Sequence, residues 1–414
     1  MKDFFNEYVK TIDTYIMFQI KETVAKITPE LVAKNRAPIS LSMGAPTKQP
    51  PEFVLNALAN TLHDKGIHTY STPKGEKFYR EAIAKKMKTK YKVELNPETE
   101  IYSLIGSKEG IANLIRALIN PTTKEDDKEI IMIPDPGYAS YKEMIKISGG
   151  LAYPVPLTPQ NNYMPNMEEV FSKLQKEGYN PQKVKALLIN YPNNPLGAVA
   201  TREYLESIIE FCKNHNILLI SDAAYIDLCF DENNKPISVL ELEGAKDICV
   251  EFYSFSKPYA MTGWRLGWVC GNSEVIKTFG KLKTTLDSGI FKALQKACAA
   301  VLNSEEGEEY IKESNQEFKH KQEVLVKGLR ELGWKDFVIP NATFYLWLPI
   351  PPKYKTSKEF TDDLLYTSGI VTAPGEAFGK YGAGFFRVSI VCSESELLEV
   401  IERMKKDGFY YTKA

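Results

Sequence analysis

The segment SFSKPYAMTGWR, residues 254–265, brings together side chains that can do chemistry. Lys257 follows Ser254 and Ser256 and precedes Arg265, and its other neighbours are mostly aromatic or small. A lysine in such surroundings is rare unless it is paired or functional. Alternating apolar residues precede the segment and the apolar run 266–270 follows it. We therefore expect Lys257 to lie on a loop between two core strands, where functional groups concentrate.

Polar residues also follow two other strand-like runs. Asn194 lies just after ALLIN, and Asp222 comes directly after ILLIS. Between such runs, apolar residues recur at helical spacing, as in residues 205–212. Uninterrupted apolar strands that alternate with amphipathic helices predict an α/β fold with a mainly parallel sheet covered on both faces. Ligands of such sheets bind beyond the carboxyl ends of the strands, where these polar residues lie.

Each of these residues also has an ordinary structural interpretation. Asp222 could cap a helix, and Asn194 could be a turn residue in YPNNPLG. Arg387, in FFRVSI, could be a surface residue of an edge strand. The apolar residues around Arg387 favour burial instead, and a buried arginine needs an anionic partner.

Gly106 and Ser107 precede an amphipathic segment, so they indicate a helix start whose backbone N–H groups could bind an anion. Alone, this pair of residues is more typical of a simple helix cap than of an anion site. No GxxxxGK[ST] segment occurs, and GAGFFR departs from the dinucleotide fingerprint at its third glycine. A nucleotide P-loop and a Rossmann cofactor site are therefore not expected.

Composition excludes several classes of function. The chain has 414 residues with 52 basic and 53 acidic side chains, a balance that gives no footprint for nucleic acid or an anionic membrane. No apolar run is long enough to span a bilayer, and the charged N-terminal residues do not resemble a signal peptide. Six cysteines without a CxxC pair indicate a reduced, cytoplasmic protein. With four histidines and no HExxH, we expect no metal site.

The order of the motifs carries a resemblance to a known family. LSMGAPT surrounds Gly44, YSTPKG begins at Tyr70, and GSKEG and PDPGY precede the segments discussed above. With YPNNPLG, SDAAY, SFSKPYAMTGWRLG and FFRVS, the chain resembles a fold-type I, pyridoxal-phosphate-dependent aminotransferase of class I/II over essentially its whole length. The resemblance implies a large seven-stranded-type sheet domain at residues 49–300. It also implies a smaller α+β domain built from the N-terminal arm (1–48) and the C-terminal part (301–414).

The resemblance implies a role for each site residue. Lys257 would bind pyridoxal 5'-phosphate covalently and then act as the general base. The other catalytic residues would be Asp222, at the pyridine nitrogen, and Tyr225, which with Asn194 would contact the ring oxygen. Tyr138 would stack on the ring. The phosphate would be bound by Ser107, Lys108, Ser254, Ser256 and Arg265, and the substrate carboxylate by Arg387 with Gly44 and Asn194.

The resemblance further implies a homodimer in which Tyr70 reaches the partner's cofactor phosphate, with amino acids and 2-oxo acids as substrates. Within the family, the chain is most similar to LL-diaminopimelate aminotransferases, which use 2-oxoglutarate in lysine biosynthesis. Pro73 stands where some of those enzymes carry an acidic residue. The sequence therefore leaves open an alanine- or aspartate-type aminotransferase, or a lyase with the same cofactor.

Overall fold

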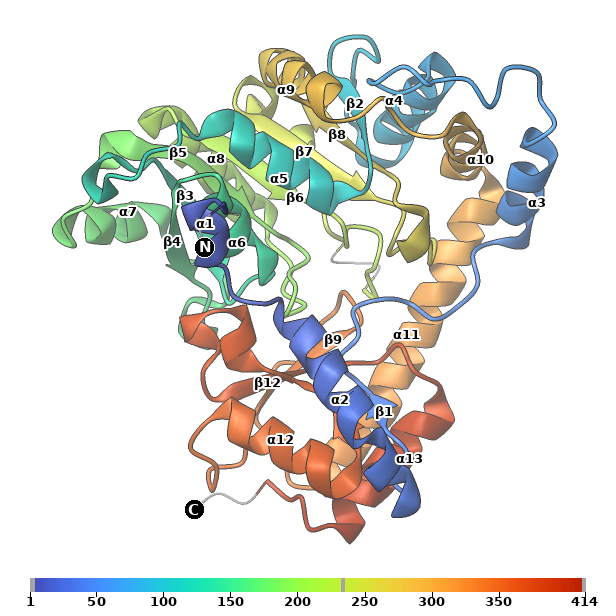
Figure 1. Cartoon of the computed structure of the whole chain (residues 1–414), viewed down its shortest axis with the longest axis vertical. Helices are drawn as coiled ribbons and strands as arrows, with labels where there is room; N and C mark the ends of the chain where they lie inside the picture. Colours follow the sequence, from blue (N-terminus) through green and yellow to red (C-terminus); the bar gives the residue numbers. More distant parts are fainter. Residues whose placement is uncertain (1–3, 232–234, 412–414) are drawn as a thin grey trace.

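A seven-stranded sheet forms the centre of the larger part of the computed structural model, which describes residues 4–231 and 235–411 (Figure 1). In spatial order the strands are β2 (Ile101–Leu104), β8 (Gly267–Gly271), β7 (Cys249–Ser254), β6 (Leu218–Asp222), β5 (Val184–Ile189), β3 (Ile130–Asp135) and β4 (Leu151–Pro156). Strand β8 runs antiparallel to both of its neighbours, and the other pairs are parallel. The predicted mainly parallel sheet is confirmed.

Helices cover both faces of this sheet because its strands are apolar on both faces. In β3, Ile131 and Ile133 pack into one core cluster, whereas Ile130 and Met132 pack into another on the opposite face. The first face is covered by α5 (Ser107–Leu118), α6 (Ser140–Ile147) and α9 (Ser273–Leu286). The second face is covered by α4 (Lys77–Tyr91), α7 (Met167–Lys176), α8 (Arg202–His215) and α10 (Lys292–Leu302).

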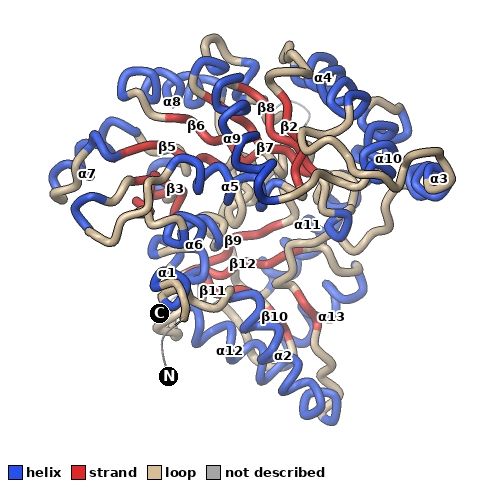
Figure 2. The backbone as a smooth tube through the Cα atoms, turned by 45° about the horizontal axis from the view of Figure 1, so that its top comes forward, coloured by secondary structure: helices blue, strands red, loops and turns tan. Residues whose placement is uncertain are grey.

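A smaller part is built around a three-stranded antiparallel sheet (Figure 2). Its strands, in spatial order, are β11 (Ala373–Pro374), β12 (Phe385–Ser389) and β9 (Tyr345–Pro349). Helices α12 (Ser357–Ser368) and α13 (Glu394–Lys406) pack against it. The N-terminal segment joins this part, because β1 (Ile39–Ser40) pairs in parallel with β10 (Ile370–Val371). The smaller α+β part, formed from the two ends of the chain, is as predicted.

One long helix belongs to both parts. This helix is α11 (Glu305–Glu331), and its N-cap Ser304 accepts a hydrogen bond from the Gly307 N–H at 3.0 Å. Ile311 lies in a core of the large sheet, whereas Leu325 and Leu329 lie in the core of the smaller part. The domain boundaries after residues 48 and 300 stay a prediction.

The remaining elements are short, apart from one N-terminal helix. The α-helices are α1 (Glu7–Lys10), α2 (Ile16–Ala33) and α3 (Glu52–Thr61). The 3-10 helices are η1 (Glu125–Asp127), η2 (Pro159–Asn161), η3 (Pro181–Lys183), η4 (Val239–Glu241), η5 (Ala245–Asp247), η6 (Thr262–Trp264), η7 (Gly375–Phe378) and η8 (Lys380–Gly382). Across residues 4–231 and 235–411, no helix combines the length and the apolar character needed to cross a membrane.

Trp334 is the largest side chain enclosed in the core of the smaller part. It is 1% exposed, its indole N–H donates to the Pro349 carbonyl at 2.8 Å, and its ring lies 6.5 Å or less from those of Phe360, Phe386 and Tyr411. Trp334→Ala should lower the free energy of unfolding by about 3–5 kcal/mol, because it leaves a cavity. Urea titration of this variant and of Leu398→Ala, at a residue 52% exposed on α13, checks this. Equal losses in the two variants would contradict the prediction.

Candidate active site

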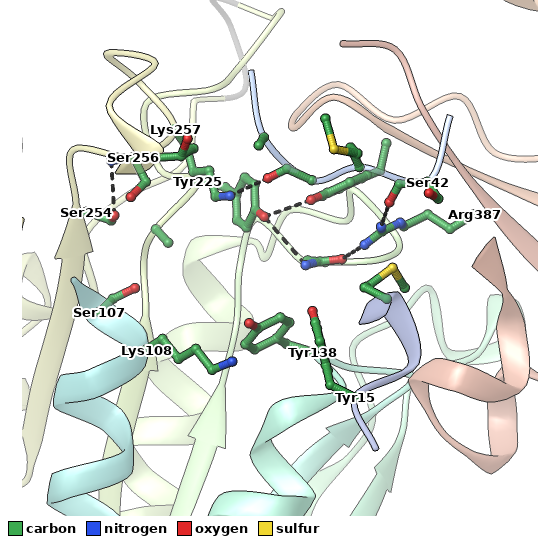
Figure 3. Close-up of a pocket in the computed structure, with 18 of the residues that line it drawn as sticks. Tyr15, Ser42, Ser107, Lys108, Tyr138, Tyr225, Ser254, Ser256, Lys257 and Arg387 are labelled. Atoms are coloured by element: carbon green, nitrogen blue, oxygen red, sulfur yellow. Dashed lines mark hydrogen bonds between the residues drawn. The ribbon is translucent and has the colours of Figure 1, made fainter. Parts of the chain in front are cut away.

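A cavity of about 800 Å³ lies where β5, β6 and β7 end, between the large sheet and the smaller part. Parallel strands end at one edge of a sheet, so the residues that follow them converge there. Figure 3 shows Lys257, Tyr225, Ser254 and Ser107 around the cavity. The predicted site residues that line it are Gly44, Ser107, Lys108, Tyr138, Asn194, Asp222, Tyr225, Ser254, Ser256, Lys257, Arg265 and Arg387. Their chemical roles stay predictions.

Lys257 lies on the loop between β7 and β8, as expected from the apolar runs on either side of it. Its ammonium donates a hydrogen bond to the Gly44 carbonyl and lies 5.6 Å from the centre of the Tyr225 ring. Burial, together with the charges of Arg387 and Arg265, lowers the pKa of Lys257 to about 8, and Asp222 opposes this effect. About a tenth of this amine is therefore neutral, and so nucleophilic, at pH 7, a far larger share than for an ordinary lysine with a pKa near ~10.4.

Asp222 is buried at the end of β6 and is held in place by three hydrogen bonds. The Tyr141 hydroxyl donates to Oδ2 at 2.5 Å, and the Ala224 N–H donates to Oδ1 at 3.2 Å. The Asn190 side-chain amide donates to the Asp222 carbonyl at 2.8 Å. Burial raises the pKa of Asp222, and the Tyr141 hydrogen bond partly offsets this. A turn rather than a helix follows, so the helix-cap interpretation is wrong.

Arg387 is 3% exposed and lies on β12, the middle strand of the small sheet, so the edge-strand interpretation is wrong. Its Nη1 donates to Asn194 Oδ1 at 2.8 Å, and its Nη2 donates to the Ser42 carbonyl at 2.6 Å. Its guanidinium lies 4.3 Å from the Tyr345 ring centre, and its Nε has no hydrogen-bond partner. No ion pair involves Arg387 among the residues that the structure describes. A buried arginine with an unused donor fits an anionic ligand.

A chain of hydrogen bonds connects Arg387 to the ring of Tyr225. The Asn194 side-chain amide donates to the Tyr225 hydroxyl at 3.5 Å, and the hydroxyls of Tyr225 and Tyr345 lie 3.0 Å apart. Asn194 therefore contacts both a cation and a phenol, a placement that a turn residue alone would not require. Its backbone N–H donates to Asn190 Oδ1 at 2.9 Å, which fixes the loop that carries it.

Several donors converge at the N-terminus of α5. Its N-cap Gly106 has no side chain to occupy the first N–H groups, and a Cβ there would lie 2.3 Å from Arg265 Nη2. Arg265 Nη1 lies 3.5 Å from the Ser256 hydroxyl, and the Ser256 N–H donates to the Ser254 hydroxyl at 3.1 Å. Backbone N–H groups, hydroxyls and a planar guanidinium match the oxygens of a phosphate.

Taken together, the cavity fits a planar cofactor that carries a phosphate and a carbonyl. The phosphate donors lie at one end, Asp222 lines the wall, and the Lys257 amine lies in reach of the same space. Among residues 4–231 and 235–411, no three His, Cys, Asp or Glu side chains are grouped in a way that could hold a metal ion.

Tyr70 is the predicted site residue that does not line this cavity. Its side chain is 86% exposed, on the loop before α4. The same loop is well fixed: Gln295, buried in α10, donates to the Ser71 hydroxyl at 2.8 Å and accepts from the Glu76 N–H at 2.7 Å. The exposed Tyr70 ring is thus held at the surface of a loop that hydrogen bonds fix, outside the cavity of this chain.

Further residues that were not predicted from the sequence line the cavity and hold the functional side chains in place. Tyr141 and Asn190 hold Asp222, Tyr345 contacts Tyr225 and Arg387, and the Ser42 carbonyl accepts from Arg387. Tyr15 also lines the cavity. Ser42 stands in LSMGAPT and Asn190 precedes YPNNPLG, so their closeness to recognised motifs was an available signal. No comparable signal in the sequence distinguished Tyr15, Tyr141 and Tyr345 from the other tyrosines, of which the chain has 23 in total.

Comparison with known proteins agrees with this geometry. The family model for aminotransferase class I and II matches residues 36–404. The LL-diaminopimelate aminotransferase 2 of Trichormus variabilis is 39% identical over 92% of this chain and 94% of its own length. Among solved structures, substrate-bound BacF from Bacillus subtilis has a TM-score of 0.91 at 32% identity, with both chains covered completely. An aspartate aminotransferase double mutant from Thermus thermophilus has a TM-score of 0.87 at 26% identity, covering 98% of this chain and 100% of its own. The chain belongs to the class I and II aminotransferases and has their fold-type I architecture.

Proposed function

We propose that this aminotransferase uses pyridoxal 5'-phosphate to move the amino group of LL-diaminopimelate to 2-oxoglutarate, in lysine biosynthesis. The observation that carries the proposal is the position of Lys257, between a phosphate-type cradle, the buried Asp222 and the unpaired Arg387 donor. The substrate is supported by the curated relatives, several of which are named LL-diaminopimelate aminotransferase. These relatives favour it over an alanine- or aspartate-type reaction or a lyase.

Each part of the cavity has a role in this proposal. The first N–H groups of α5, at Ser107 and Lys108, bind the phosphate together with Ser254, Ser256 and Arg265. The Asp222 carboxylate would accept a hydrogen bond from the protonated pyridine nitrogen and keep that nitrogen protonated, and this pairing would favour the charged carboxylate despite its burial. Tyr225 and Asn194 would donate to the ring oxygen, and Tyr138 would lie against the ring.

The proton transfer falls to Lys257. When bound, the cofactor supplies an electron sink that stabilises negative charge at the substrate Cα. Lys257 would hold the cofactor at its carbonyl carbon and, as a free amine in the presence of substrate, would be the base that moves the Cα proton. A positioned base of this kind contributes roughly 10²–10⁴-fold. Arg387 binds the α-carboxylate with its planar fork, assisted by Asn194 and the Gly44 backbone, and so orients the Cα–H bond.

The proposal includes a homodimer located in the cytoplasm. The exposed Tyr70 supports the dimer, since it would reach the cofactor phosphate of the partner subunit. The cytoplasmic location is supported by the cysteines, because none within the described residues forms a disulfide and most are buried.

A panel of half-reactions tests the function. The purified protein loaded with pyridoxal 5'-phosphate is mixed with LL-diaminopimelate, glutamate, alanine or aspartate, and the cofactor absorbance is followed. LL-diaminopimelate and glutamate should convert the cofactor fastest, and 2-oxoglutarate should reverse the change. The substrate assignment is wrong if alanine or aspartate reacts faster than LL-diaminopimelate. Release of product without any requirement for a 2-oxo acid would indicate a lyase.

The lowered pKa of Lys257 predicts a pH profile. In the cofactor-free protein, the rate at which a small amine-reactive reagent labels Lys257 should rise tenfold per pH unit below about pH 8 and level off above it. Only the neutral amine reacts, and its fraction saturates above the pKa. Mass spectrometry of quenched samples measures the rate. The urea-unfolded chain is the control, since an unperturbed lysine titrates near ~10.4. A Lys257 rate that keeps rising to pH 10 in the folded chain would refute the lowered pKa.

Arg387→Lys separates a substrate clamp from a structural residue. The variant keeps the charge but loses the fork, and a charge-assisted hydrogen bond is worth about 1.5–3 kcal/mol. The apparent dissociation constant of every amino-acid substrate should rise by roughly ten- to a hundredfold, with little change in cofactor binding or melting temperature.

The matched control is Arg403→Lys, at a buried arginine of α13 that pairs with Glu399 and does not line the cavity. It should leave substrate affinity unchanged. If Arg387→Lys lowers the melting temperature strongly while substrate affinity is retained, Arg387 is a structural residue.

A further inference from the structure

We propose that Lys283 is a positioning residue for the cofactor phosphate, because it neutralises Glu109 in the first turn of α5. The inference rests on the proposed role of this helix end in holding the phosphate. Lys283 does not line the cavity. It lies behind the first turn of α5, whose residues Ser107 and Lys108 line the cavity.

Lys283 is a lysine enclosed by the protein. Its side chain is 0% exposed, and its ammonium lies 3.0 Å from Glu109 Oε1 and 2.5 Å from Asp287 Oδ2. The ring of Tyr102, 4% exposed, is close to the same carboxylates, whose charges add to burial in raising its pKa to about 12. Burying an ammonium inside a protein is costly unless it is paired with an anion. The burial of Lys283 therefore needs a structural or functional explanation.

The hydrogen bonds of Glu109 give that explanation. Its Oε2 accepts from the Ile105 N–H at 3.0 Å, and its Oε1 accepts from the Asn113 side chain as well as from Lys283. The Ile105 carbonyl in turn accepts from Arg265 Nη2 at 3.3 Å. Glu109 therefore holds the turn 105–107 in the conformation that leaves the first N–H groups of α5 uncapped.

The same carboxylate creates an electrostatic conflict. Glu109 lies in the first turn of α5, at the end of the helix where a phosphate dianion would bind. Two negative groups this close repel each other strongly when partly buried. The Lys283 ammonium, which Glu109 shares with Asp287, reduces this repulsion, so that Glu109 can organise the turn while opposing the phosphate less.

Asp287 extends the arrangement toward a second loop. Its Oδ1 accepts from the Gly289 N–H at 2.9 Å, and a Cβ at Gly289 would lie 2.8 Å from the Thr72 carbonyl. Thr72 belongs to the loop that carries Tyr70. The buried lysine thus stands between the phosphate turn and the loop expected to reach the partner subunit.

The experiment measures binding rather than turnover. Dissociation constants of pyridoxal 5'-phosphate and of pyridoxal, which lacks the phosphate, are determined for the cofactor-free wild type and its variants. The ratio of the two constants reports the phosphate contribution alone. The variants are Lys283→Met, Lys283→Met with Glu109→Gln, and Glu109→Gln alone. The matched control is Lys86→Met, at another buried lysine, which pairs with Glu308 and does not line the cavity.

Lys283→Met should weaken pyridoxal 5'-phosphate binding by about tenfold or more while changing pyridoxal binding by less than about threefold. Adding Glu109→Gln should restore most of the loss, because the carboxylate in the first turn of α5 is gone and the remaining Asp287 belongs to the C-cap of α9. Lys86→Met should leave the ratio unchanged. Equal weakening of both ligands by Lys283→Met, or no weakening, would overturn the inference.

If Lys283→Met does not fold, Glu109→Gln decides, since its glutamine can still accept from the Ile105 N–H. The inference expects its preference for the phosphorylated ligand to stay or rise, and a tenfold fall would overturn it. A wild-type chain that binds both ligands equally would refute the proposed cofactor site itself, whatever the variants do.

Discussion

An excess of positive charge in the cavity is the constraint on which the site depends. Lys257, Arg265 and Arg387 all line the cavity, whereas Asp222 is the carboxylate that lines it within the described residues. The cations lower the pKa of the lysine, and no carboxylate within residues 4–231 and 235–411 forms an ion pair with Arg387. Such a cavity is stable only if its cations are bonded to neutral oxygens, as they are to the carbonyls of Gly44, Ser42 and Ile105. The same bonds leave donors available for anionic ligands.

This constraint also explains why two parts of the chain are needed. The large sheet delivers Asp222 and Lys257 from adjacent strand ends, and the small sheet delivers Arg387. The contact between Arg387 and Asn194 joins the two parts inside the cavity itself. Helix α11 joins them outside it, with side chains in both cores. The position of the carboxylate-binding group relative to the lysine is therefore fixed by packing on both sides.

Much of this arrangement could be predicted because the motifs lie next to recognisable strands and helices. The apolar runs around residues 186–194, 217–222 and 248–257 placed Asn194, Asp222 and Lys257 at one sheet edge, where the structure has them. Long-range partners could not be predicted in this way. Tyr141 and Tyr345 contact Asp222 and Tyr225 across 81 and 120 residues of sequence. The edge-strand alternative for Arg387 arose because β11, a strand of 2 residues, is too short to give a pattern.

The close approach of Gly106 to Arg265 limits how the sequence can drift. The space that a side chain at residue 106 would occupy is filled by the Arg265 guanidinium, so no larger residue fits while that arginine keeps its position. Residue 106 also has a φ of +82°, which disfavours any L side chain on its own account. The close contact with Arg265 and the positive φ thus each disfavour any other residue at position 106. In a homologue that has lost Arg265, the positive φ at residue 106 would still favour glycine. We therefore expect the glycine to be retained even where the phosphate site has been lost.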